Sequence, residues 1–226
     1  MLSPSAPRQL ALSLAHAESF ARADFLPGAA NADALALIER WPDWPDRALA
    51  LVGPEGAGKS HLAAIWAEIA GARFLAARAL GEADLLAALA TGALVVEDVA
   101  GRFDQRALFH LINLVREEEA WLLITARRAP TSWTVALPDL ASRLRAIPAV
   151  TIAPPDDAML GAVLLKLFSD RQIKVEDNLI SYLITRTERS FAGARTVVER
   201  LDAEALRLKR PVTRALAAET LRAGTA

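Results

Sequence analysis

The sequence contains no cysteine, only three histidines and a single tyrosine. Without cysteine the chain can form neither a disulfide nor a zinc site with thiolate ligands. His16, His61 and His110 are too scattered in the sequence to suggest a metal centre. No apolar run approaches the roughly 20 residues that a membrane-spanning helix needs. We therefore expect a protein without disulfides, without a zinc–cysteine site and without a membrane partner.

The chain also lacks an excess of charge of either sign. It has 26 Lys and Arg residues against 27 Asp and Glu residues, for a net charge of −1. No overall basic field therefore points to independent binding of a DNA duplex. With 226 residues, 53% of them hydrophobic and 23% charged, the composition predicts a globular protein. This length fits one sizeable domain, or one domain with a small appendage.

The segment Gly-Pro-Glu-Gly-Ala-Gly-Lys-Ser at 53–60 matches the motif G-x-x-x-x-G-K-[ST]. An apolar run at 48–52 precedes it, and apolar residues at helical spacing follow it over 61–70. A strand, a glycine loop and a helix in this order bring backbone N–H groups and a helix N-terminus onto phosphate. Lys59 would reach the terminal phosphates, and the Ser60 hydroxyl would ligate Mg²⁺. The predicted nucleotide cradle consists of Gly53, Pro54, Gly56, Ala57, Gly58, Lys59, Ser60 and His61.

A second chemical signal follows the apolar run Ala93–Val96, where Glu97 and Asp98 stand side by side. A buried strand that delivers acids at its carboxyl end, beside a phosphate-binding loop, is typical of a site that holds Mg²⁺ and activates water. We therefore expect Glu97 to join Ser60 at the metal and Asp98 to act in hydrolysis.

Strand and helix patterns alternate through the first two thirds of the chain. Expected strands at 48–52, 72–77, 93–98, 121–125 and 150–152 are separated by helical patterns, which predicts an α/β fold with a five-stranded parallel sheet. Pro154-Pro155 marks a boundary, and only helical patterns follow it. The expected domains are an extended tail at 1–17, a nucleotide-binding α/β domain at 18–155 and a small all-α lid at 156–226.

The tail at 1–17 has leucines at 10, 12 and 14, and this period of two favours an extended segment over a helix. Such a strand suits docking into a groove of another protein, and the alternative is an edge strand that packs on its own domain. The apolar stretch 10–17 ends in Ala-His-Ala, like a signal peptide, but Ser13 and His16 interrupt it. Because the nucleotide site implies a compartment with ATP, we expect a cytoplasmic protein.

The sequence leaves open which residues hold the base of a nucleotide. Phe25 lies in an expected loop at 18–30, and Trp41 and Trp44 alternate with prolines in a second loop. The tryptophans could cover a base, although loop tryptophans are more often plain packing. We consider Phe25, the tryptophan loop or neither of them.

The order of these parts resembles the AAA+ ATPases, in which a nucleotide-binding α/β domain precedes a helical lid. Gly-Lys-Ser-His-Leu at 58–62 resembles the phosphate-binding loop of the replication initiator DnaA and its relatives. Leu-Pro-Asp-Leu-Ala-Ser-Arg-Leu at 137–144 resembles the arginine-finger segment of Hda-type regulators, and Gln-Leu-Ala-Leu-Ser-Leu at 9–14 resembles their clamp-binding motif. Across most of its length the chain is similar to this DnaA-related family.

The resemblance implies further roles for individual residues. It implies that Arg143 is an arginine finger acting in trans on a nucleotide held by a partner; a surface arginine paired with Asp139 is the alternative. It implies that Arg189 reaches back to the phosphates as a sensor-2 residue, with Arg186 and Arg195 as alternatives. The residues it implies in binding the β sliding clamp of DNA polymerase III are Gln9, Leu10, Leu12 and Leu14.

The chain departs from the family pattern at two positions. The family has Asp where this chain has Glu97, and DnaA-type proteins have Asp at the sensor-1 place where this chain has Arg127. Both changes fall where hydrolysis would be set up, whereas the phosphate cradle is intact. We therefore expect firm nucleotide binding with weak or no ATPase activity, and the bound nucleotide implied by the resemblance is ADP, with ATP as the alternative.

As a function, the resemblance implies negative regulation of replication initiation, with the sliding clamp and DnaA as partners. Because no helix-turn-helix domain follows the expected lid, we expect contact with DNA and nucleoid through the clamp, without independent sequence-specific binding. One alternative is a self-contained AAA+ ATPase such as a helicase loader. A non-enzymatic DNA-binding adaptor is another, which the charge balance disfavours. The oligomeric state stays open, and a homo-oligomer is one option.

Overall fold

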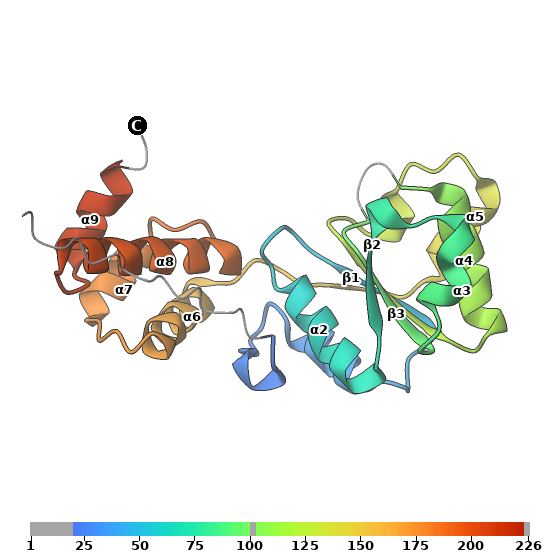
Figure 1. Ribbon diagram of the computed structural model, residues 1–226, viewed down its shortest axis with the longest axis horizontal. Coiled ribbons are helices and arrows are strands. Elements are labelled where there is room, and N and C mark those ends of the chain that lie inside the picture. The colour runs from blue at the N-terminus through green and yellow to red at the C-terminus, as the bar shows by residue number, and fades with distance from the viewer. Residues whose placement is uncertain (1–19, 100–102, 224–226) are drawn as a thin grey trace, which may run out of the picture.

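The computed structural model describes residues 20–99 and 103–223. An α/β core and a helical lid lie at opposite ends of its long axis (Figure 1). The core holds one parallel sheet in the order β2-β3-β4-β1-β5. Its strands are β1 (Ala48–Val52), β2 (Arg73–Ala76), β3 (Ala93–Glu97), β4 (Trp121–Ala126) and β5 (Ala149–Thr151). The prediction of a five-stranded parallel sheet is confirmed.

Helices cover both faces of the sheet, because the apolar central strands must be shielded from water on each side. On one face α1 (Ala32–Glu39) and α2 (Lys59–Ala70) close a core that contains Trp44 and Trp66. On the other face a second core lies beneath α3 (Leu85–Ala88), α4 (Gln105–Glu117) and α5 (Pro138–Ala146). The 3₁₀ turns of the core are Arg22–Asp24, Ala77–Ala79, Glu82–Asp84 and Pro130–Ser132.

The lid has a hydrophobic core of its own, formed by residues between Leu160 and Ala217. Phe168 and Leu201 are fully buried in it. The lid helices are α6 (Asp157–Asp170), α7 (Asp177–Ile184), α8 (Phe191–Leu208) and α9 (Arg214–Ala223). Side chains cap three of them: Asp156 accepts from the Met159 N–H at the start of α6, Ser190 from the Gly193 N–H at the start of α8, and Thr213 from the Leu216 N–H at the start of α9.

Candidate nucleotide-binding site

The segment between β1 and α2 has the backbone geometry of a phosphate-binding loop. Gly56 has a φ of 70° and Gly58 a φ of 95°, and Gly58 directly precedes the first turn of α2. Both angles lie in the left-handed region that glycine adopts without steric cost. The two glycines thus permit the tight turn that aims the N-terminus of α2 at a bound anion.

Lys59 lies at the mouth of this loop. Its Nζ donates to the carbonyl oxygens of Gly53 at 2.9 Å and Pro54 at 2.7 Å. Burial lowers the pKa of Lys59 from its usual 10.5; nearby Asp98 raises it, Arg127 lowers it and Glu55 raises it. The ammonium group is therefore held at the loop by neutral carbonyls that a phosphate can replace.

A cavity of about 250 Å³ lies beside Lys59, where three neighbouring strands end. β1 leads into the phosphate-binding loop, β3 ends at Glu97, and β4 contributes Thr125. The buried Thr125 hydroxyl accepts from the Asp98 N–H at 3.0 Å, which fixes the backbone that carries the acid. The cavity is lined by Glu55, Gly56, Lys59, Ser60, Glu97, Asp98, Thr125 and Arg127.

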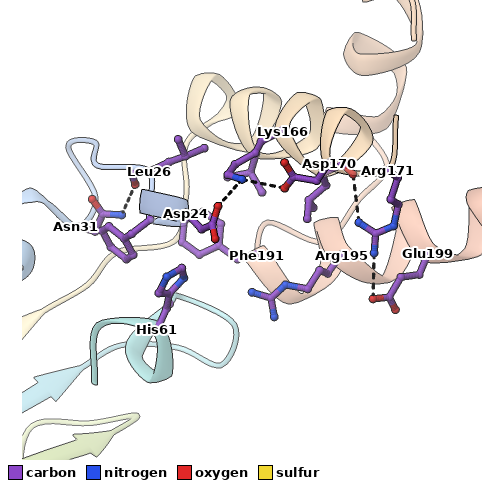
Figure 2. Close-up of a pocket in the computed structure, with 14 residues that line it drawn as sticks. Asp24, Leu26, Asn31, His61, Lys166, Asp170, Arg171, Phe191, Arg195 and Glu199 are labelled. Carbon is purple, nitrogen blue, oxygen red and sulfur yellow. Dashed lines mark hydrogen bonds and ion pairs between the residues drawn. The ribbon is translucent and has the colours of Figure 1, made fainter. Parts of the chain in front are cut away.

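A larger cavity of about 490 Å³ lies between the core and the lid. Figure 2 shows Asp24 and His61 on the core side, with Lys166 and Arg195 facing them from lid helices α6 and α8. Lys166 donates to Asp24 at 2.7 Å and to Asp170 at 2.9 Å; these two carboxylates, Asp170 foremost, raise its pKa. Gly58 also borders this cavity, so the phosphate-binding loop lies between the two hollows.

Phe25 lines the larger cavity, whereas the tryptophan loop does not border either cavity. Phe25 packs edge-on against His61, with 5.2 Å between ring centroids. Trp41 packs edge-on against Trp66, and Trp44 stacks on it, in the core beneath α2. The indole rings are therefore used to fill the core, which is the plain-packing alternative for this loop.

The lid touches the phosphate-binding loop directly. The Phe191 N–H donates to the Gly56 carbonyl at 2.8 Å. A methyl group added at Gly58 would lie 3.3 Å from the Phe191 ring, and one at Gly56 would lie 2.8 Å from Ser190 Cβ. The N-terminus of α8 thus closes over the two glycines that shape the loop.

The sensor-2 candidates on the lid have different surroundings. Arg189 is exposed and pairs with Asp157 at 2.8 Å, and it borders neither cavity. The Arg186 guanidinium lies over the Tyr182 ring, 4.1 Å from its centroid. Arg195 lines the larger cavity and projects toward His61 and Asp24 (Figure 2). Of these three arginines, Arg195 is the one that lines either of the two cavities.

Arg143 lies on α5, which lies with α3 and α4 on the side of the sheet away from the lid (Figure 1). It borders neither cavity. Within residues 20–99 and 103–223 no ion pair joins it to Asp139 or to any other acid. The residue is half-buried.

The residues at the smaller cavity fit a nucleotide with Mg²⁺. Ser60, Glu97 and Asp98 supply oxygen ligands, which Mg²⁺ prefers, and Lys59 supplies a cation for phosphate. Among the described residues no group of three or more His, Asp and Glu could hold a metal by itself. A magnesium ion here would therefore take further ligands from phosphate and water, as it commonly does in proteins.

Two further expectations from the sequence concern the clamp-binding residues and membrane-spanning helices. Gln9, Leu10, Leu12 and Leu14 lie outside the described residues. In the described ranges, the helices are too short or too polar to cross a bilayer.

The arrangement of a parallel sheet, a phosphate-binding loop and a helical lid can be compared with known proteins. No protein-family model matches the chain. DnaA of Thermomicrobium roseum is 27% identical over 136 residues, which cover 58% of this chain and 28% of DnaA. DnaA of Symbiobacterium thermophilum is 29% identical over 133 residues, covering 57% and 29%. The chain thus matches less than a third of the length of these curated relatives.

Solved structures show the same fold. Domain III of Thermotoga maritima DnaA superposes with a TM-score of 0.74 at 16% identity, covering 90% of this chain and 95% of that one. AMPPCP-bound DnaA from Aquifex aeolicus gives 0.66 at 16% identity, covering 81% and 65%. A variant of RuvB from Thermotoga maritima gives 0.68 at 15% identity, covering 86% and 68%. The chain therefore has the AAA+ P-loop fold. Its sequence is similar to that of the replication initiator DnaA.

Proposed function

We propose that the chain is a DnaA-related AAA+ regulator of the Hda type, which limits replication initiation. It binds a nucleotide with Mg²⁺ at Gly53–Ser60, and it docks on the sliding clamp through residues 9–14. It then inserts Arg143 into the nucleotide site of DnaA and stimulates hydrolysis of the ATP held there. Its own nucleotide, for which we propose ADP, mainly fixes the shape of the protein. This activity takes place in the bacterial cytoplasm, at the nucleoid through the clamp.

The position of Arg143 supports this proposal best. Arg143 lines neither of the two cavities described above, and its helix α5 lies with α3 and α4 on the side of the sheet away from the lid (Figure 1). A planar group that keeps its charge at every relevant pH suits the charge that develops on a transferring phosphoryl group. Arg143 is therefore suited to act on a nucleotide held by another protein.

Site-directed variants on α5 test the finger. We expect the wild type to accelerate ATP hydrolysis by DnaA on clamp-loaded DNA, and Arg143→Ala to lose this effect. Arginine fingers contribute about 10³- to 10⁵-fold to hydrolysis, so the loss should be at least about a hundredfold. Arg145→Ala, on the same helix, is the matched control. Full stimulation by Arg143→Ala would overturn the assignment.

Docking of residues 9–14 on the sliding clamp would raise the local concentration of the protein near DnaA on the same DNA. We expect Gln9→Ala combined with Leu10→Ala to abolish capture by immobilised clamp, while nucleotide binding stays intact. Unchanged capture would remove the clamp from the proposal and leave the nucleotide site untouched.

The geometry of the smaller cavity favours a second candidate, a self-contained AAA+ ATPase such as a helicase loader. Glu97 and Asp98 border the same hollow as Lys59 and Ser60, so an acid pair, a cation and a hydroxyl converge. In that case Arg143 would act on a second copy of this chain in a homo-oligomer. Steady ATP turnover by the purified protein, lost in Asp98→Asn, would favour this candidate over the first.

A further inference from the structure

An ion pair bridges the mouth of the smaller cavity. Arg127 Nη2 donates to Glu55 Oε2 at 2.6 Å, and both residues line the hollow beside Lys59 and Ser60. Glu55 belongs to the phosphate-binding loop itself, between Pro54 and Gly56. The pair therefore joins this loop to the end of a neighbouring strand.

The sheet explains how Arg127 comes to this place. It is the first residue after β4, and β4 lies between β1, which leads into the phosphate-binding loop, and β3, which delivers Glu97. Ligands of open parallel sheets bind beyond the carboxyl ends of the strands. Arg127 lines the same cavity as Lys59. Since a P-loop lysine contacts the terminal phosphates, a third phosphate bound there would lie within reach of Arg127.

A bound phosphate can replace Glu55 as the partner of Arg127. Their side chains are 54% and 77% exposed, and such surface pairs contribute little to stability because water screens them. An arginine also binds phosphate through two parallel hydrogen bonds, which makes phosphate a strong competitor for the guanidinium. Both charges act on Lys59, where Arg127 lowers and Glu55 raises the pKa, in addition to the larger effect of burial.

We propose that Glu55 and Arg127 form an exchangeable pair that sets the preference of this site between nucleoside diphosphate and triphosphate. The inference rests on the nucleotide binding proposed above. With a diphosphate bound, Arg127 stays on Glu55 and neutralises it. A third phosphate competes with Glu55 for Arg127. Glu55 thus favours the diphosphate, and an Arg127 released from Glu55 favours the triphosphate.

The experiment compares the dissociation constants of ADP and the non-hydrolysable ATP analogue AMPPCP, both with Mg²⁺. We expect Glu55→Gln to shift the preference toward AMPPCP by roughly two- to fivefold, the range of a surface ion pair. Arg127→Ala should shift it toward ADP by roughly tenfold, as expected for a charge-assisted hydrogen bond. The control is Arg128→Ala: Arg128 is exposed, borders neither cavity and should leave the ratio unchanged.

The double variant shows whether Glu55 acts through Arg127. If it does, adding Glu55→Gln to Arg127→Ala changes the ratio no further. A full Glu55 effect in the absence of Arg127 would overturn the exchange and leave only repulsion by the carboxylate. A ratio that no variant moves would overturn the inference while nucleotide binding stands. If the wild type binds neither nucleotide, the proposed nucleotide site itself is wrong.

Discussion

At the scale of single residues, Lys59 is the cation of the proposed nucleotide site, and a phosphate can replace the partners that it has in this structure. Lys59 Nζ is bound to the Gly53 and Pro54 carbonyls, which are neutral acceptors. A phosphate offers a charged acceptor in the same place, and charge-assisted hydrogen bonds are about twice as strong as neutral ones. The lysine therefore contributes more to the binding of a nucleotide than to the folded state without one.

Lys59→Ala should weaken ADP binding by about ten- to a hundredfold, since it removes a charge-assisted contact and the positive field at the phosphates. Fluorescence titration with a labelled ADP measures the dissociation constant. Lys174→Ala, which removes an exposed lysine of the lid, should bind as the wild type does. Equal affinity of the two variants would contradict the assignment of Lys59.

His61 predicts a pH dependence of stability. Burial lowers its pKa from the usual 6.5, and Arg195 and Arg22 lower it further, against the opposing effects of the Ala21 carbonyl and Asp24. A group with a lowered folded-state pKa binds fewer protons when folded than when unfolded, so folding is favoured above the unfolded-state value. The contribution of His61 is thus complete above about pH 6.5 and is lost as the pH falls toward the folded-state pKa.

Chemical denaturation at about pH 7.5 and about pH 5.5 tests this sign. We expect the wild type to lose more stability over this interval than His61→Gln does. His110→Gln, which changes an exposed histidine on α4, should behave as the wild type does. An identical loss in all three proteins would show that His61 contributes no pH dependence.

The positions of Glu97 and Asp98 could be predicted from the sequence. Glu97 and Asp98 follow a buried strand, and the rule that parallel strands end together is enough to bring them to the lysine. The positions of Lys166 and Arg195 at the larger cavity could not be predicted, because they depend on how the lid packs on the core. No spacing in the sequence reports that packing, which is why three arginines remained open as sensor-2 candidates.

At the scale of elements, the unit formed by β1, the phosphate-binding loop and α2 is held by close backbone contacts. A methyl group at Gly53 would lie 2.5 Å from the Ile152 carbonyl oxygen, just beyond β5. Because that atom belongs to the backbone next to the sheet, it cannot move aside cheaply. Gly53 is thus needed for close approach of two backbones at the site.

Gly53→Ala should therefore lower the free energy of unfolding by about 1–3 kcal/mol, the usual cost of overpacking. Gly81→Ala is the control, because an added methyl group there meets no atom within 4 Å. Urea denaturation gives both values. Equal stability of the two variants would show that the loop relaxes without cost.

The sequence predicted the long periodic elements to within a few residues, and it failed where local signals are short. The helical pattern between the expected strands at 72–77 and 93–98 is a 3₁₀ turn followed by the single turn of α3. α5 was recognised only as a motif, because its core-facing residues are just Leu140 and Leu144. Two buried residues do not establish a helical period, so the tertiary contact with α4 defines this helix.

At the scale of the whole molecule, the lid and the core meet around the proposed nucleotide. The Phe191 N–H bonds to the Gly56 carbonyl, and Lys166 reaches Asp24 across the larger cavity. A ligand that fills the space between them adds contacts to both parts. Nucleotide binding should therefore stabilise the closed arrangement as a unit.

ADP with Mg²⁺, at a concentration of about 100 times its dissociation constant, should stabilise the folded protein by about 2.7 kcal/mol. For a chain of this size that corresponds to a rise in Tm of about 5–11 °C. Thermal unfolding measures the shift, and Lys59→Ala at the same ADP concentration should lose about half of it or more. A shift of equal size in Lys59→Ala would place ADP at another site.

We propose that the chemistry takes place in DnaA and that this chain supplies Arg143. The direct measurement is a single turnover in which DnaA is loaded with ATP labelled on its terminal phosphate and the present chain holds only unlabelled ADP, on clamp-loaded DNA. We predict rapid release of labelled phosphate with the wild type and with Arg145→Ala, and release at the rate of DnaA alone with Arg143→Ala. Rapid release with Arg143→Ala, or release only when this chain itself carries the labelled ATP, would contradict the account.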